Sequence, residues 1–316
     1  MNVSINVNDD SLLKAYSQER YGFNPDLLST QEIKAIKQLA KEKRIDFGLS
    51  PIGEHIFKYL FEKEGNIFFE GEKFNNPDLD AILYMPDVTT DNVFIILNTN
   101  QPLLNQIFAT AHEYYHYLND VDFLRKNPHV CSLTSMDTKN EQKASRFAAE
   151  FLLPDEALRK SVNYWLDFIN KKEFSDADLI EAAYLCYGIA IEYALPLKAV
   201  LYRLYEEKYI HNIDQYITNY EFIKKSFRSA IRRYSKQASE LLNAENPYII
   251  EYMYDYAINA FRNGFVTLEK LEHELEILNL NKEIVLDDLD IDLEEDTEEI
   301  PDDLKASLYR DITGKG

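Results

Sequence analysis

The sequence is poor in glycine, proline and cysteine. Nine glycines and ten prolines in 316 residues favour long helices over many short strands. The two cysteines, Cys131 and Cys186, lie far apart, and the first residues show no export signal, so we expect reduced thiols in the cytoplasm. No run of eighteen apolar residues occurs, so no transmembrane helix is expected.

Positive charge is also scarce. The net charge of −21 disfavours direct binding to a nucleic-acid backbone. Residues 287–303 carry eleven acidic residues and no basic one, and we expect the acidic tail to be disordered. A basic stretch at 222–239 has apolar residues at helical spacing. It is either a solvated face or a docking surface for an acidic partner, such as this tail.

The pattern of apolar residues and helix signals predicts a mostly helical α+β protein, and the 46% hydrophobic content allows a sizeable core. Three short apolar segments separated by turn-rich stretches favour a small antiparallel sheet. We predict strands at Ile67–Glu70, Ala81–Tyr84 and Val93–Leu97; helices at 30–44, 51–64, 101–119 and 140–153; a helix pair at 176–210 broken at Leu195-Pro196; and helices over 216–280 with a break at Asn263-Gly264.

The sequence contains one H-E-x-x-H pentapeptide, residues 112–116, inside the segment QIFATAHEYYHYLND. Four residues make slightly more than one helical turn, so His112 and His116 project from one face, with Glu113 beside them. This spacing can hold one Zn²⁺ and place a carboxylate next to its bound water. The alternative is a helix face with two incidental histidines.

A catalytic zinc site needs a third protein ligand. Glu141 is the best candidate, because it begins the next predicted helix and shares a face with the small residues Ala144 and Ala148. Glu150 is the rival, but nine positions along the helix rotate it to the opposite side, where we expect it to be solvated.

Two stretches resemble the ImmA/IrrE family of zinc metallopeptidases. The first is FIILNTNQPLLNQIFATAHEYYHYLN, and the second, EQKASRFAAEFLLP, is similar to the family signature E-x-x-A-x-x-F-A-x-x-L-L-x-P. A third stretch, PLKAVLYRL, is similar to the helix that closes the family's domain. The resemblance implies that Glu141 is the third zinc ligand, that Glu113 is the catalytic base, and that the substrate is a DNA-binding repressor.

The motif departs from the family at two positions. Tyr115 replaces a small residue, which could alter helix packing or narrow the cleft. Asp120 replaces a histidine found in many members. It lies one turn after His116, so it either orients that imidazole or is an exposed acid at the helix end.

We therefore predict a cytoplasmic zinc endopeptidase that holds one Zn²⁺ per chain through His112, His116 and Glu141. Its expected partner is a protein substrate, a helix-turn-helix repressor. One alternative is a regulator that binds a repressor or toxin without cleaving it. Another is a closed structural zinc site with His129 or Cys131 as fourth ligand. The predicted organisation is a helical extension (1–50), a metallopeptidase domain (51–212), a helical region (213–283) and an acidic tail (284–316).

Overall fold

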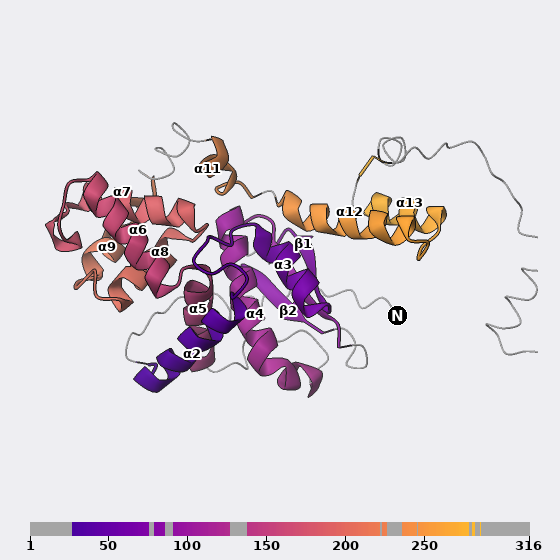
Figure 1. Cartoon of the computed structure of the whole chain (residues 1–316), viewed down its shortest axis with the longest axis horizontal. Helices are drawn as coiled ribbons and strands as arrows, with labels where there is room; N and C mark the ends of the chain where they lie inside the picture. Colours follow the sequence, from indigo (N-terminus) through magenta and orange to yellow (C-terminus); the bar gives the residue numbers. More distant parts are fainter. Residues whose placement is uncertain are drawn as a thin grey trace, which may run out of the picture. The chain divides into compact units, whose positions relative to one another are not determined.

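The fold is mostly helical with one small sheet, as the sequence predicts (Figure 1). The structure is a computed structural model of the chain. It describes residues 27–75, 79–85, 91–126, 138–221, 223–225, 236–244, 246–277, 280–281 and 285. The acidic tail, the pair His129 and Cys131, and most of the basic stretch lie outside these residues. Two compact units, 1–252 and 253–316, are described separately.

The helices and strands of the described residues follow one another along the chain. They are α2 (Thr30–Lys43), α3 (His55–Glu64), β1 (Ile67–Glu72), β2 (Ala81–Tyr84), β3 (Val93–Asn98), α4 (Leu103–Lys126), α5 (Thr138–Leu152), α6 (Asp155–Phe168), η2 (Phe174–Asp176), α7 (Leu179–Glu192), α8 (Leu197–Glu206), α9 (Asp214–Thr218), α11 (Lys236–Glu240), α12 (Pro247–Arg262) and α13 (Leu268–Ile277).

The three predicted strands form one mixed sheet in the order β1-β3-β2. The β2–β3 pair is antiparallel, as predicted, with Ala81 opposite Leu97. The β1–β3 pair is parallel, with Ile67 opposite Val93, so the prediction of a wholly antiparallel sheet is wrong here. The turn-rich segments suggested that consecutive strands pair as hairpins. Strand β3 instead lies between β1 and β2, and it runs parallel to β1. Strand β3 is the buried centre of the sheet.

Helix α4 packs against β2 and β3 and also against α5. It is longer than the predicted helix at 101–119 and extends to Lys126. Helix α5 matches the predicted second helix, and its Ala144 and Ala148 are fully buried. Small side chains at these positions allow two helices to approach closely, which positions the residues of α5 next to α4.

The two N-terminal helices show how local signals set helix ends. Ser29 caps α2 in a capping box with Glu32, as its sequence suggests. Helix α3 ends at Gly65, as predicted, in a left-handed conformation with φ of 73°. It begins at His55 rather than Pro51, because Gly53 also has a left-handed φ of 52° and interrupts the helical path.

The region after α5 contains a helix that the sequence analysis missed, α6, which begins directly after the extended Pro154. The predicted pair at 176–210 is confirmed as α7 and α8, which meet at an angle of 109°. None of the described helices is alone long and apolar enough to cross a membrane; α7 and α8 meet that test only as a bent pair.

In the predicted 216–280 region the described residues form α9, α11, α12 and α13, and the break at Gly264 is confirmed by its left-handed φ of 72°. Within the second unit, Ile258, Leu271, Leu275 and Val285 form a small core of their own. This core accounts for the compactness of that unit, since apolar side chains removed from water supply most of the driving force for packing.

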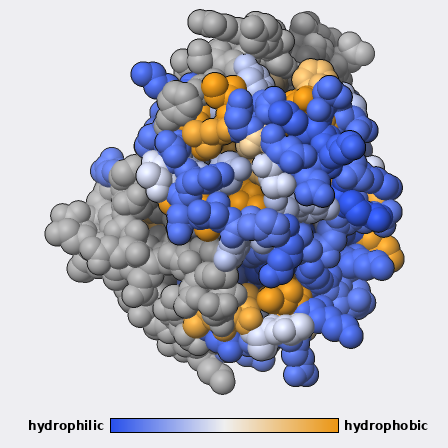
Figure 2. All heavy atoms as spheres, turned by 90° about the vertical axis from the view of Figure 1, so that its left-hand side faces the viewer, coloured by the Kyte–Doolittle hydropathy of each residue, from blue (hydrophilic) through white to orange (hydrophobic). Residues whose placement is uncertain are grey.

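On the face that Figure 2 turns to the viewer, the described residues are mostly hydrophilic, with apolar side chains in small groups between polar ones. Helices α6 and α7 carry four of the eight large exposed apolar side chains among the described residues: Tyr164, Phe168, Ile180 and Tyr184. Scattered groups of this kind are normal on a protein surface and need no partner to explain them.

Candidate metal centre

The three motif residues are buried in the middle of α4. His112 is 1% exposed, and Glu113 and His116 are 0% exposed. Ile107 and Ala111, from the apolar lead-in to the motif, are also fully buried and hold this part of the helix in the core. The motif is therefore not an exposed helix face with incidental histidines, because ionisable groups are rarely buried without partners.

Helix α5 brings Glu141 to the two histidines. Its Oε2 lies 3.1 Å from His112 Nε2, and its Oε1 lies 3.3 Å from His116 Nε2. The two Nε2 atoms are 3.3 Å apart. One ligand atom from each residue lies within 4.8 Å of the others, so the three side chains converge on one point.

The nitrogens on the far side of both imidazoles also have partners. His116 Nδ1 lies 2.7 Å from Asp120 Oδ2, so Asp120 contacts the imidazole rather than standing as an exposed acid. His112 Nδ1 lies 3.3 Å from Ser145 Oγ. Asn140 Nδ2 donates to both carboxylate oxygens of Asp120. The sequence analysis did not single out Asn140 or Ser145, although Ser145 is one helical turn from Glu141.

The charges around the histidines favour a cation. Burial alone would lower the pKa of His116, but its close contacts with Asp120 and Glu141 and the charge of Glu113 raise it to about 9. Burial would likewise raise the pKa of Glu141, yet its contacts with the imidazoles of His112 and His116 hold it far below its usual range. Three carboxylates thus surround two imidazoles.

The donor set fits a divalent zinc ion. Glu141 Oε1 is buried and makes no hydrogen bond, although it lies 3.3 Å from His116 Nε2. A buried carboxylate oxygen without a hydrogen bond is costly unless another positive partner meets it. Two imidazole nitrogens and one carboxylate are also the protein ligands of several catalytic zinc sites, which keep a further position open.

Tyr115 faces the interface between α4 and α5. Its ring is 6% exposed and packs 5.6 Å from the ring of Phe147, centroid to centroid. It also meets His116 edge-on at 5.9 Å. The ring of Tyr115 therefore takes part in the packing of α4 against α5.

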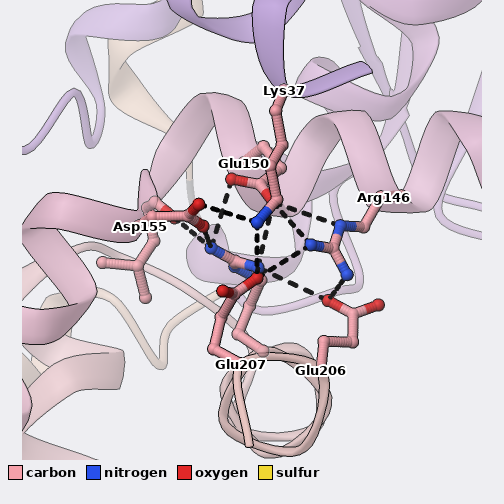
Figure 3. A network of polar contacts seen from close by, with 8 residues as sticks. Lys37, Arg146, Glu150, Asp155, Glu206 and Glu207 are labelled. Carbon is pink, nitrogen blue, oxygen red and sulfur yellow. Dashed lines mark hydrogen bonds and ion pairs between the residues drawn. The ribbon is translucent and has the colours of Figure 1, made fainter. Parts of the chain in front are cut away.

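The rival ligand, Glu150, lies in a separate cluster, and its predicted solvation is wrong. Its side chain is 3% exposed and pairs with Arg146 and Arg203. Figure 3 shows this charge cluster, in which Lys37 and Arg146 point toward acidic side chains. Its members are Lys37, Arg146, Glu150, Asp155, Arg203, Glu206 and Glu207.

The carboxylates of the charge cluster already pair with basic side chains of the same cluster. The carboxylates of Glu150, Asp155 and Glu207 are close enough together to hold a metal ion. Lys37 Nζ, however, lies 2.7 Å from Asp155 and 2.8 Å from Glu207. Burial would raise the pKa of Asp155, but Lys37 and Arg203 lower it to about 2. The cluster therefore ties helices together, and among the described residues the histidine site is the better metal centre.

The sequence was compared with models of known protein families, and one family matches the region that contains this site. The sequence model of the IrrE N-terminal-like domain, Peptidase_M78, matches residues 66–205. This region is therefore similar to the Peptidase_M78 domain. It runs from β1 to α8 and so contains both motif helices, as the ImmA/IrrE resemblance implied.

The chain also has a distant structural likeness to a solved structure. A "Mycobacterium tuberculosis transcriptional regulator" is similar over 62% of this chain, with 14% identity and a TM-score of 0.35. The chain spans about half, 51%, of the length of that structure. No curated protein matches the chain.

Proposed function

We propose that this chain is a zinc-dependent endopeptidase that hydrolyses a peptide bond in a protein substrate. The observation that carries the proposal is the convergence of His112, His116 and Glu141 directly beside the buried carboxylate of Glu113. The Peptidase_M78 match supports a metallopeptidase-like domain. One zinc per chain would be held by these two imidazoles and one carboxylate.

The chemistry divides between the ion and the side chains. A zinc ion bound here would polarise the scissile carbonyl and lower the pKa of a bound water. Glu113 would accept the proton of the attacking water and deliver it to the leaving amine. His112 and His116 would stay neutral, with Nε2 directed at the ion and Nδ1 held by Ser145 and Asp120.

The sheet suggests where an extended substrate would bind. Strand β3 is central in the described sheet, so it cannot be an edge. Strand β2 is an edge and contacts the motif helix α4. An extended peptide could add to β2 through its main chain while its scissile bond reaches the motif.

The substrate class rests on the family resemblance. We propose a DNA-binding repressor of the helix-turn-helix type, cleaved in the cytoplasm. The acidic balance of the chain agrees with a basic protein partner and not with direct binding of nucleic acid. The acidic tail at 287–303 would attract such a partner over a distance.

The decisive variant is Glu113→Gln, which keeps size and polarity but removes the base. We expect it to bind zinc as the wild type does and to cleave a candidate repressor at least about 100-fold more slowly. Zinc content and the rate of cleavage are the two measurements. Full biological activity in this variant would instead favour the non-catalytic regulator.

A further inference from the structure

Each imidazole of the candidate metal centre contacts polar side chains through both of its ring nitrogens. Its Nε2 faces the shared point, and its Nδ1 faces a polar side chain. An imidazole can present only one nitrogen to a metal when the other carries the proton, so the group that accepts that proton selects the tautomer. Ser145 Oγ stands in that place for His112, and Asp120 does so for His116.

Asp120 is itself held by α5. Asn140 Nδ2 lies 3.1 Å from its Oδ1 and 3.0 Å from its Oδ2. An amide nitrogen can only donate, so both hydrogen bonds require Asp120 to accept. The carboxylate is therefore fixed with Oδ2 directed at His116 Nδ1.

Three residues of helix α5 therefore contribute to the site, namely Asn140, Glu141 and Ser145. Glu141 and Ser145 are four residues apart and share a face, while Asn140 is next to Glu141. We propose that Asn140 and Ser145 are positioning residues that set both zinc-binding imidazoles, so that α5 organises the whole metal centre and does not only supply Glu141. This inference rests on the proposed function, because it assumes that zinc is the ion bound.

The test measures the zinc affinity of the full chain by competition with a chromophoric chelator. Ser145→Ala removes only the hydroxyl that faces His112 Nδ1. Asn140→Asp has nearly the same shape but places a carboxylate against Asp120, which converts attraction into repulsion. We expect each variant to bind zinc at least about tenfold more weakly than the wild type.

Two matched variants control for general effects. Ser161→Ala removes another buried serine hydroxyl, which donates to Glu192 on α7. Asn119→Ala removes an asparagine that lies three residues after His116 and donates to the backbone of Tyr115. Neither contacts an imidazole of the site, so we expect unchanged zinc affinity. Ser145→Thr keeps the hydroxyl and should restore most of the affinity.

A spectroscopic readout separates positioning from stability. In the zinc-loaded wild type, ¹⁵N chemical shifts should show His112 and His116 as single tautomers protonated on Nδ1. In Ser145→Ala, His112 alone should change, whereas in Asn140→Asp the change should centre on His116. Thermal unfolding of the zinc-free proteins checks that each variant folds.

The outcomes are distinguishable. Unchanged zinc affinity in both Ser145→Ala and Asn140→Asp, together with wild-type tautomers, would overturn the inference while the proposed zinc site stands. Failure of the wild-type chain to bind zinc in a manner that depends on Glu141 would overturn the proposed function and this inference with it. Weaker binding in the two test variants only, with rescue by Ser145→Thr, supports it.

Discussion

Two glutamates on one helix have different surroundings. Glu141 meets two imidazoles, and Glu150 meets two guanidinium groups. Nine residues at 3.6 per turn place them on opposite sides of α5. The partner of Glu150, Arg203, is fully buried, and burial that would lower its pKa is more than offset by Glu150, Glu206 and Glu207. Glu150 therefore stabilises the fold.

Replacing Glu150 tests this structural role. Glu150→Gln removes the buried charge that faces Arg146 and Arg203, so we expect a loss of about 3 kcal/mol in the free energy of unfolding. Zinc affinity should stay unchanged, because Glu150 is not a ligand. Urea titrations of the variant and of the surface control Glu156→Gln, expected within about 0.5 kcal/mol of wild type, provide the comparison. A folded Glu150→Gln protein unable to bind zinc would contradict this assignment.

Among the elements, α2 packs with the family-matched region, although the match begins only at residue 66. It packs along α5 (Figure 1). Its Glu32 pairs with Lys139 and Lys143 on α5, and its Lys37 enters the charge cluster. The predicted N-terminal extension thus supports the helix that carries Glu141.

The capping interactions in the first turn of α2 should make the stability of the folded chain depend on pH in the acidic range. Hydrogen bonds from the backbone and side chain of Ser29, with help from Lys139, lower the pKa of Glu32 from 4.5 to about 2. A carboxylate with a depressed pKa stabilises the fold above its unfolded pKa, and this contribution is lost as pH falls from about 4.5 toward 2.

The measurement is the melting temperature as a function of pH. Glu32→Gln should lower it at pH 7 and narrow its gap from wild type as the pH approaches 2. Glu42→Gln, on the same helix, is the control because Glu42 accepts a hydrogen bond from the neutral Gln38. A constant gap for Glu32→Gln between pH 7 and pH 2 would count against this explanation.

The start of α4 depends on a segment outside the family-matched region. The amides of Leu103 and Leu104 donate to the carbonyl oxygens of Asn243 and Leu241. The buried side chain of Gln106 donates to Ala244 O and accepts from Asn246. The first amides of a helix lack partners within the helix, so residues 241–244 and Asn246 cap the helix that carries the motif.

Gln106→Ala should loosen this cap. Removing the side chain leaves buried polar groups without their partner, which costs about 1–3 kcal/mol. We expect faster amide hydrogen exchange at Leu103 and Leu104 and a lower melting temperature. Asn105→Ala is the neighbouring control, since its amide bonds within the same turn to Gln101. Equal exchange rates in the two variants would show that the segment does not stabilise α4.

At the scale of the whole molecule, zinc should stabilise the folded chain. The ligands come from two helices, so the site exists only when α4 and α5 are packed together. An ion that binds only the folded state stabilises it by about 4 kcal/mol at a thousand times its dissociation constant. Thermal unfolding with zinc and then with excess EDTA should show a rise and its reversal. The same rise in Glu141→Gln would exclude Glu141 as a ligand.

Local patterns in the sequence were sufficient for much of the structure. The capping box at Ser29, the stop at Gly65 and the break at Gly264 are set by a few neighbouring residues. The shared face of His112 and His116, and the orientation of Glu141 away from Glu150, follow from helical periodicity. These features could be predicted because each depends on residues that are close in sequence.

Contacts between distant segments were decided only by the tertiary structure. The parallel pairing of β1 with β3, the burial of Glu150 against Arg203 and the contact of Ser145 with His112 each join residues more than 20 positions apart. No local pattern specifies which distant segments meet, since this depends on how the apolar faces pack together. The sequence alone therefore determined the residues proposed to bind zinc, and packing of α5 against α4 decided how their side chains are oriented.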